Sequence, residues 1–162
     1  MAGTINILYV GEPKDNYIRL GISEFEKRIS AFAKVRNICI KPQNPPEDPT
    51  DGEIAAALEK ESVMLMQKLS EKGMGKRIAL CVEGMEYSSE EFASLIDQAF
   101  RDAGDMTLVI GSSHGLSESV KKMCDIRLSF SKMTFPHALA RLILTEQIYR
   151  AFTIINGRRY HK

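Results

Sequence analysis

Short apolar runs alternate with longer amphipathic segments along the 162-residue chain, and this alternation constrains the fold more than any other feature. Strands are predicted at the short runs, which are rich in residues that favour β-structure: 5–10, 35–40, 78–82, 106–110 and 126–130. Helices are predicted at the longer segments: 15–32, 51–72, 89–103, 117–123 and 137–155. Strands that alternate with helices predict an α/β fold, with a mainly parallel sheet flanked by helices.

Turn and capping residues set the expected boundaries of these segments. Asp15 is suited to cap the first helix, and the run Ser88-Ser89-Glu90-Glu91 is suited to open the third. Glu83-Gly84 is expected to close the third strand. Residues 42–49 hold four of the six prolines, which predicts one long loop and no linker. We therefore expect residues 1–162 to form a single domain.

Several classes of protein are unlike this sequence. The apolar runs are too short to span a membrane, and the amino terminus lacks a basic segment followed by an apolar core, so no membrane partner or signal peptide is expected. The three cysteines, Cys39, Cys81 and Cys124, form no CxxC pair and have no histidine at ligand spacing. We therefore expect a cytoplasmic protein with no disulfide framework and no metal site.

The near-neutral net charge of +1 conceals an uneven distribution. Residues 1–118 carry 13 basic and 19 acidic side chains, whereas residues 119–162 carry 9 basic and 2 acidic ones. Such asymmetry is typical of proteins that bind a polyanion with one part of their surface. A chance accumulation of basic residues late in the chain is the alternative interpretation.

Two connections after predicted strands are candidates for ligand binding. Gly111-Ser112-Ser113-His114-Gly115 follows the fourth strand, where glycines let the backbone approach a nucleotide-like ligand, although a generic turn has the same composition. The motif is neither a dinucleotide fingerprint nor an NTPase loop. The segment 128–137 after the fifth strand is largely apolar and lacks glycine. It indicates either a tight core crossover or contact with an apolar ligand face such as an adenine ring.

The last helix and the tail suggest further contacts. Residues 137–155 are apolar on more than one face, which predicts a homodimer if the helix is not wholly internal to the chain. Arg141, Glu146, Tyr149 and Arg150 are spaced to pair along the same helix. The final five residues combine cations, an aromatic ring and an imidazole, which suit phosphate contact and base stacking, although most terminal tails are frayed.

The sequence resembles the ribosomal RNA large subunit methyltransferase H family. The resemblance is strongest in Ser129-Phe130-Ser131-Lys132-Met133-Thr134-Phe135-Pro136-His137, in Glu146 to Phe152 and in Tyr160-His161-Lys162, and weaker before Ile78. It implies a SPOUT-type fold with a carboxyl-terminal trefoil knot. It also implies a homodimer that uses S-adenosyl-L-methionine to methylate N3 of a pseudouridine in the intersubunit stem-loop of 23S rRNA, on the assembled bacterial ribosome.

Site residues follow from the resemblance position by position. The implied cofactor-binding residues are Leu80, Gly111, Phe130, Ser131, Lys132, Met133, Thr134 and Phe135. Ser112 departs from the family's pattern, in which a second glycine follows Gly111. Catalytic candidates are His161, for proton handling or base orientation, and Tyr160, for stacking on or bonding to the base. The expected RNA-binding residues are Arg150, Arg158, Arg159 and Lys162.

Two other functions are compatible with the same residues. The chain could be a ribosome-binding factor of the same fold without methyl transfer, with Ser112 as the sign of a spoiled cofactor pocket. It could also be a nucleotide-binding α/β protein with no RNA partner. Cofactor binding distinguishes the first alternative from the methyltransferase, and ribosome affinity distinguishes the second.

Overall fold

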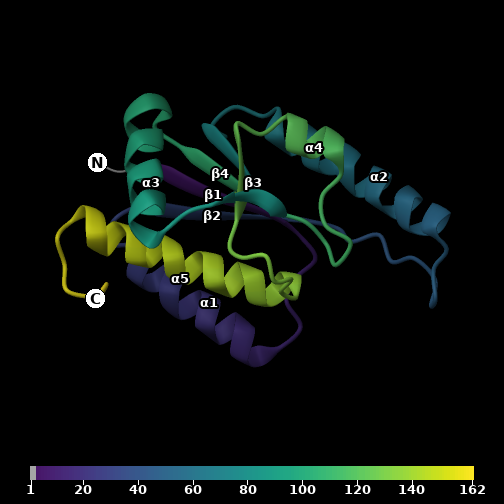
Figure 1. The fold of residues 1–162 in the computed structure, drawn as a ribbon, viewed down its shortest axis with the longest axis horizontal. Coiled ribbons are helices and arrows are strands. Elements are labelled where there is room, and N and C mark those ends of the chain that lie inside the picture. Colours follow the sequence, from purple (N-terminus) through teal and green to yellow (C-terminus); the bar gives the residue numbers. More distant parts are fainter. Residues whose placement is uncertain (1–2) are drawn as a thin grey trace.

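A five-stranded sheet forms the centre of the molecule, in a computed structural model that describes residues 3–162 (Figure 1). Every paired strand is parallel to its neighbour, and the strand order is β2-β1-β4-β3-β5. The strands are β1 (Thr4–Val10), β2 (Lys34–Ile40), β3 (Lys76–Glu86), β4 (Met106–Ile110) and β5 (Ile126–Ser129). The predicted α/β class is confirmed, and the described sheet is parallel throughout.

Helices cover both faces of the sheet. They are α1 (Asn16–Ile29), α2 (Asp51–Leu69), α3 (Ser89–Ala103), α4 (Glu118–Lys122) and α5 (His137–Ile155). On one face α5 packs against both α1 and α3, whereas α2 and α4 lie together on the other face (Figure 1). The residues of β1 alternate between the two cores, Ile5 and Ile7 facing α5 and Leu8 facing α2, as the two-residue period of a strand requires.

Reciprocal caps fix the start of two helices. The Ser88 hydroxyl accepts from the backbone N–H of Glu91 at 3.1 Å, and the Glu91 carboxylate accepts from the backbone N–H of Ser88 at 2.7 Å. Thr50 and Glu53 form the same arrangement at the start of α2. The predicted opening of α3 is therefore confirmed. Asp15 occupies the capping position of α1, but its side chain makes no capping hydrogen bond.

The third strand differs most from its predicted extent. It continues to Glu86, past the Glu83-Gly84 pair that was expected to end it. Its pairing with β5 is irregular between Leu80 and Met85. A Cβ on Gly84 would lie 2.7 Å from the backbone carbon of Arg127, so this glycine permits close approach of the two strands and does not end β3.

The remaining connections agree with the sequence. Residues 42–49 contain no helix or strand, which confirms the predicted loop. Within residues 3–162, no helix has the length and apolar character needed to cross a membrane. The trefoil knot and the single-domain assignment stay predictions.

Candidate functional site

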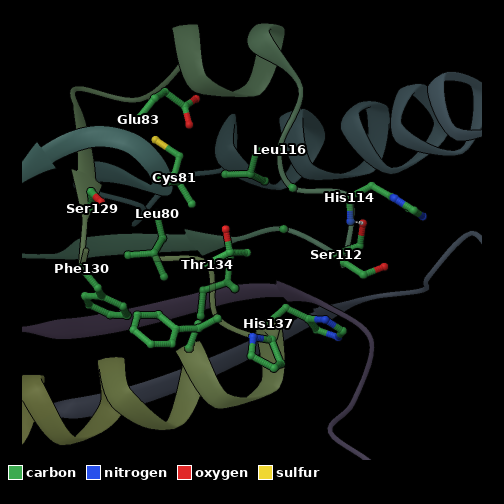
Figure 2. Close-up of a pocket in the computed structure, with 18 of the residues that line it drawn as sticks. Leu80, Cys81, Glu83, Ser112, His114, Leu116, Ser129, Phe130, Thr134 and His137 are labelled. Carbon is green, nitrogen blue, oxygen red and sulfur yellow. Dashed lines mark hydrogen bonds between the residues drawn. The ribbon is translucent and has the colours of Figure 1, made fainter. Parts of the chain in front are cut away.

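A cavity of about 820 Å³ opens at the carboxyl ends of three adjacent strands. Leu80 to Glu83 of β3, Ile110 of β4 and Ser129 of β5 contribute to its wall. Figure 2 shows Leu80 and Phe130 toward one end of the cavity, with Ser112 and His114 toward the other. The carboxyl ends of parallel strands are where open α/β sheets bind ligands, and the volume is in the usual range for small-molecule pockets, roughly 300–1,000 Å³.

The glycine-containing loop after β4 forms a tight turn against the cavity. The backbone N–H of Gly115 donates to the carbonyl of Ser112 at 2.9 Å, and Gly115 has a φ of 82°, which glycine adopts without strain. A Cβ on Gly111 would lie 2.3 Å from the Gly115 carbonyl oxygen. Gly111 is therefore required for the turn itself, independently of any ligand.

Ser112 turns its hydroxyl toward α2. Its Oγ donates to the Glu61 carboxylate at 2.9 Å. The same oxygen accepts from the backbone N–H of His114, with 3.4 Å between the nitrogen and the oxygen (Figure 2). The side chain that departs from the family's pattern is thus held by a partner outside the cavity wall. Ser112 itself still lines the cavity.

The connection from β5 to α5 supplies the apolar side of the cavity. Phe130, Met133, Thr134, Phe135 and Pro136 line it together with Ser131. The loop is braced by its own serines: Ser129 Oγ donates to the carbonyl of Ser131 at 2.9 Å, and Ser131 Oγ accepts from the backbone N–H of Met133 at 3.0 Å. An apolar wall beside a turn with free backbone groups suits a flat heteroaromatic ring attached to a polar group.

Few charged groups face the cavity. Lys121 from α4 forms an ion pair with Glu83, and this hydrogen bond is the main reason why the pKa of Glu83 lies below its usual value. Burial raises the pKa of the Cys81 thiol, so the thiol is protonated at neutral pH. His114 and His137 also line the wall.

Most of the predicted cofactor residues come together here. Seven of the eight line the cavity: Leu80, Gly111, Phe130, Ser131, Met133, Thr134 and Phe135. The eighth, Lys132, is exposed and is not part of the wall. Sequence reasoning missed Glu83 and Lys121, whereas His137 lies within the segment 128–137 that was a candidate for ligand contact. The meeting of strand ends at one edge of a parallel sheet could have indicated Glu83, but no sequence signal placed Lys121 beside it.

The predicted catalytic residues of the tail lie away from the cavity. Neither Tyr160 nor His161 lines the cavity. The Tyr160 hydroxyl donates to the Glu146 carboxylate at 3.1 Å, and its ring meets the Tyr149 ring with centroids 4.8 Å apart. The chain enters α5 at the cavity and reaches the tail only after its 19 residues, about 28 Å along the axis at ~1.5 Å per residue.

The contacts of His161 select one state of its ring. Nδ1 lies 3.2 Å from Arg150 Nη1, and Nε2 lies 2.6 Å from Glu90 Oε1. A guanidinium can only donate, so Nδ1 must accept, and Nε2 then carries the proton that is donated to the carboxylate. In this tautomer, the ring nitrogen with the lone pair, Nδ1, is the one in contact with Arg150.

The predicted pairs along α5 are only partly present. Arg150 bonds Glu146 at 2.5 Å, as the spacing predicted. Arg141 instead reaches out of its helix, with its guanidinium 3.7 Å from the centroid of the Tyr9 ring and 3.8 Å from Glu12. Arg141 is buried between α5 and β1, and spacing along one helix cannot reveal partners on other elements.

Comparison with known proteins gives a family for this fold and site. The family described as "Predicted SPOUT methyltransferase" matches residues 4–161. A Bacillus thuringiensis protein named ribosomal RNA large subunit methyltransferase H is 44% identical over 159 residues, which cover 98% of this chain and 99% of that protein.

Solved structures support the fold alone. A probable methylase family protein from Haemophilus influenzae superposes with a TM-score of 0.57 at 14% identity, covering all of this chain and 72% of the other. A probable methyltransferase from Bordetella pertussis gives a TM-score of 0.56 at 15% identity, covering 93% and 96% of the two chains.

The family model and the 44% identical relative match nearly the whole sequence, and the chain folds into a parallel sheet with a ligand-sized cavity at its carboxyl edge. We conclude that this chain belongs to the SPOUT methyltransferase family, whose cofactor is S-adenosyl-L-methionine.

Proposed function

We propose that this protein transfers a methyl group from S-adenosyl-L-methionine to large-subunit ribosomal RNA in the cytoplasm. Its target is N3 of a pseudouridine in the intersubunit stem-loop of 23S rRNA, on the assembled ribosome. The 44% identity to a protein named ribosomal RNA large subunit methyltransferase H, over 98% of this chain, carries the proposal.

The cavity suits the cofactor. Leu80, Phe130 and Phe135 offer apolar surface for an adenine ring, while the turn at Gly111 brings backbone groups close to the cavity. Lys132 is exposed and does not line the cavity, so we assign it a weaker role than its seven companions.

The reaction demands positioning more than strong acid–base chemistry. When bound, S-adenosyl-L-methionine would supply its sulfonium methyl group to N3 and leave as a neutral thioether, and the N3 proton would pass to a base or to water. Holding the methyl group in line with N3 supplies much of the acceleration.

His161 and Tyr160 are the side chains that we assign to the target base. To accept the N3 proton, His161 must leave Arg150, because that contact occupies Nδ1 in the position described here. Tyr160 keeps a phenol O–H whose pKa is raised, chiefly by burial, so it can donate to a uracil carbonyl at any physiological pH.

In a dimer, the tail of one chain can reach the cavity of the other. We infer that the protein is a homodimer in which each tail reaches the partner's cavity, because its own cavity lies at the far end of α5. Much of the surplus apolar surface of α5 is covered by α1 and α3 within one chain. The exposed apolar residues Tyr17 and Leu20, 68% and 70% exposed on α1, are the better candidates for a dimer contact.

The basic tail is the proposed contact with RNA. Arg158, Arg159 and Lys162 are exposed and can neutralise phosphates. Arg150 pairs with Glu146 and contacts His161, so we expect it to orient the tail as well as to bind phosphate. Three or four such contacts predict ribosome affinity that falls markedly as salt rises.

Mass spectrometry of 23S rRNA from cells with and without the gene tests the specific reaction. The stem-loop pseudouridine should lose one methyl group when the gene is deleted and regain it on complementation. An unchanged methylation state would refute the assignment. Calorimetry with S-adenosyl-L-methionine addresses the alternative of a ribosome-binding factor without chemistry, which requires ribosome affinity and no cofactor binding.

A further inference from the structure

Glu61 is a buried carboxylate that the reaction described above does not use. It lies on α2, on the sheet face opposite α5, and is only 3% exposed. Oε1 accepts from Ser112 Oγ at 2.9 Å, and Oε2 accepts from the backbone N–H of Gln43 at 3.2 Å. Among residues 3–162 it forms no ion pair with a Lys or Arg.

A carboxylate in such a position has lost almost all of its contact with water. Burying a carboxylate without a counterion is unfavourable unless hydrogen bonds replace the water that it loses. Both of its bonds reach segments that have no regular structure, the proline-rich loop and the turn after β4. A hydrophobic residue would fill the same space without fixing either segment.

The next residue on α2, Ser62, makes a hydrogen bond to the other end of the loop that follows β4. Ser62 Oγ lies 2.6 Å from Ser117 Oγ, and Ser117 caps α4. Two consecutive side chains of one long helix therefore hold residues 112 and 117, and the segment between them contributes Ser113, His114, Gly115 and Leu116 to the cavity wall. The loop is therefore held by α2, which lies on the face of the sheet opposite α5.

We propose that Glu61 is a positioning residue for the cofactor site and acts through Ser112. The hydroxyl at residue 112 gives the carboxylate a donor that a glycine in this position would not provide. Glu61 and Ser112 thus form a matched pair, and the serine is part of a working site. This inference rests on the proposed binding of S-adenosyl-L-methionine in the cavity.

Isothermal titration of S-adenosyl-L-methionine into the full-length protein tests the pair. The variants are Glu61→Ala, Ser112→Ala and the double variant, with Glu59→Ala as the matched control because Glu59 is exposed on the same helix. If the loop keeps its binding arrangement about one-tenth of the time without the pair, the dissociation constant rises about tenfold. Each single variant should show this rise, and the control should bind as the wild type does.

Coupling between the two residues is the sharper measurement. Since both single variants break the same bond, the double variant should bind no more than about two- to threefold more weakly than the weaker-binding single variant. Independent effects would instead make it about tenfold weaker than that variant, or about a hundredfold weaker than the wild type. With assembled ribosomes as substrate, KM for the cofactor should rise while kcat at saturating cofactor stays close to that of the wild type.

Three results would overturn the inference while leaving the proposed function intact. Wild-type affinity in both single variants means that the pair does not position the loop. Independent, multiplying effects mean that Glu61 does not act through Ser112. A lower melting temperature and a smaller bound fraction, at an unchanged dissociation constant, mean that Glu61 only supports the fold. If the wild type itself does not bind S-adenosyl-L-methionine, the proposed function fails as well.

Discussion

Replacing Gly111 with alanine should damage the cofactor site in a way that can be calculated from the geometry. The new Cβ would lie 2.3 Å from the carbonyl oxygen of Gly115. Ordinary contact begins about 1.1 Å farther out, near 3.4 Å, and a backbone carbonyl cannot rotate away as a flexible side chain can. Relief therefore requires the turn after β4 to open, at a cost of about 1–3 kcal/mol, the usual range for overpacking.

The cost should appear first in ligand binding, because the turn lines the cavity. If the opened turn must close again to bind S-adenosyl-L-methionine, 1–3 kcal/mol corresponds to a dissociation constant roughly five- to 150-fold higher. If instead the whole fold absorbs the strain, the melting temperature falls by about 2–4 °C for each kcal/mol in a chain of this size. Calorimetry and thermal unfolding on the same sample separate these outcomes.

Gly52→Ala is the matched control for Gly111→Ala. Gly52 lies in the first turn of α2, where the nearest atom to a new Cβ is Thr50 Oγ1 at 3.9 Å. Alanine is the better helix former by up to about 1 kcal/mol, so the same substitution should leave binding unchanged and leave stability equal or higher. Wild-type cofactor affinity and stability in Gly111→Ala would refute the reasoning from close approach.

Four other changes probe the tail, the ion pair, the thiol and a helix cap. His161→Ala should bind S-adenosyl-L-methionine with unchanged affinity in calorimetry but methylate ribosomes far more slowly; equal rates would exclude any role in proton transfer. Glu83 has a lowered pKa, so its contribution to stability is present above about 4.5, its ordinary value, and is lost as the pH falls through the lower folded value; melting curves of Glu83→Gln against pH should therefore lack that acid-side loss. The raised pKa of Cys81 should make its alkylation at pH 8 slower than that of free cysteine, and the cofactor should slow it further, as peptide mass spectrometry can measure. Ser88→Ala should cost about 1 kcal/mol in chemical denaturation, and no loss would mean that the cap is dispensable.

Local patterns predicted the elements because each is fixed by nearby residues. The start and end of α5 at His137 and Ile155 and the cap at Ser88 follow from hydrophobic spacing and from hydroxyl and carboxylate side chains a few positions apart. The strand order β2-β1-β4-β3-β5 could not be predicted, because it depends on contacts between segments far apart in sequence. The extent of β3 was missed for a related reason: Gly84 is a turn residue by composition, and its role is visible only beside Arg127 of β5.

The candidate site divides in the same way. The family resemblance identified Leu80, Gly111 and the apolar loop, and the structure gathers them at one edge of the sheet. Glu61 could not be found, because a glutamate among lysines and alanines on a helix is usually on the solvent side. Its burial is a property of how α2 packs, and its partner Ser112 is 51 residues away.

Helix α5 is continuous from the cavity to the tail, so its length and twist fix the position and the rotation of the proposed RNA-binding tail relative to the cavity. Each residue of an α-helix adds about 1.5 Å and turns the chain by about 100°. A single inserted residue would therefore swing the following side chains around the axis and expose positions such as Ile148 that now face the core. The length of this helix should consequently tolerate far less variation than its sequence, and insertions should be confined to the loops that precede and follow it.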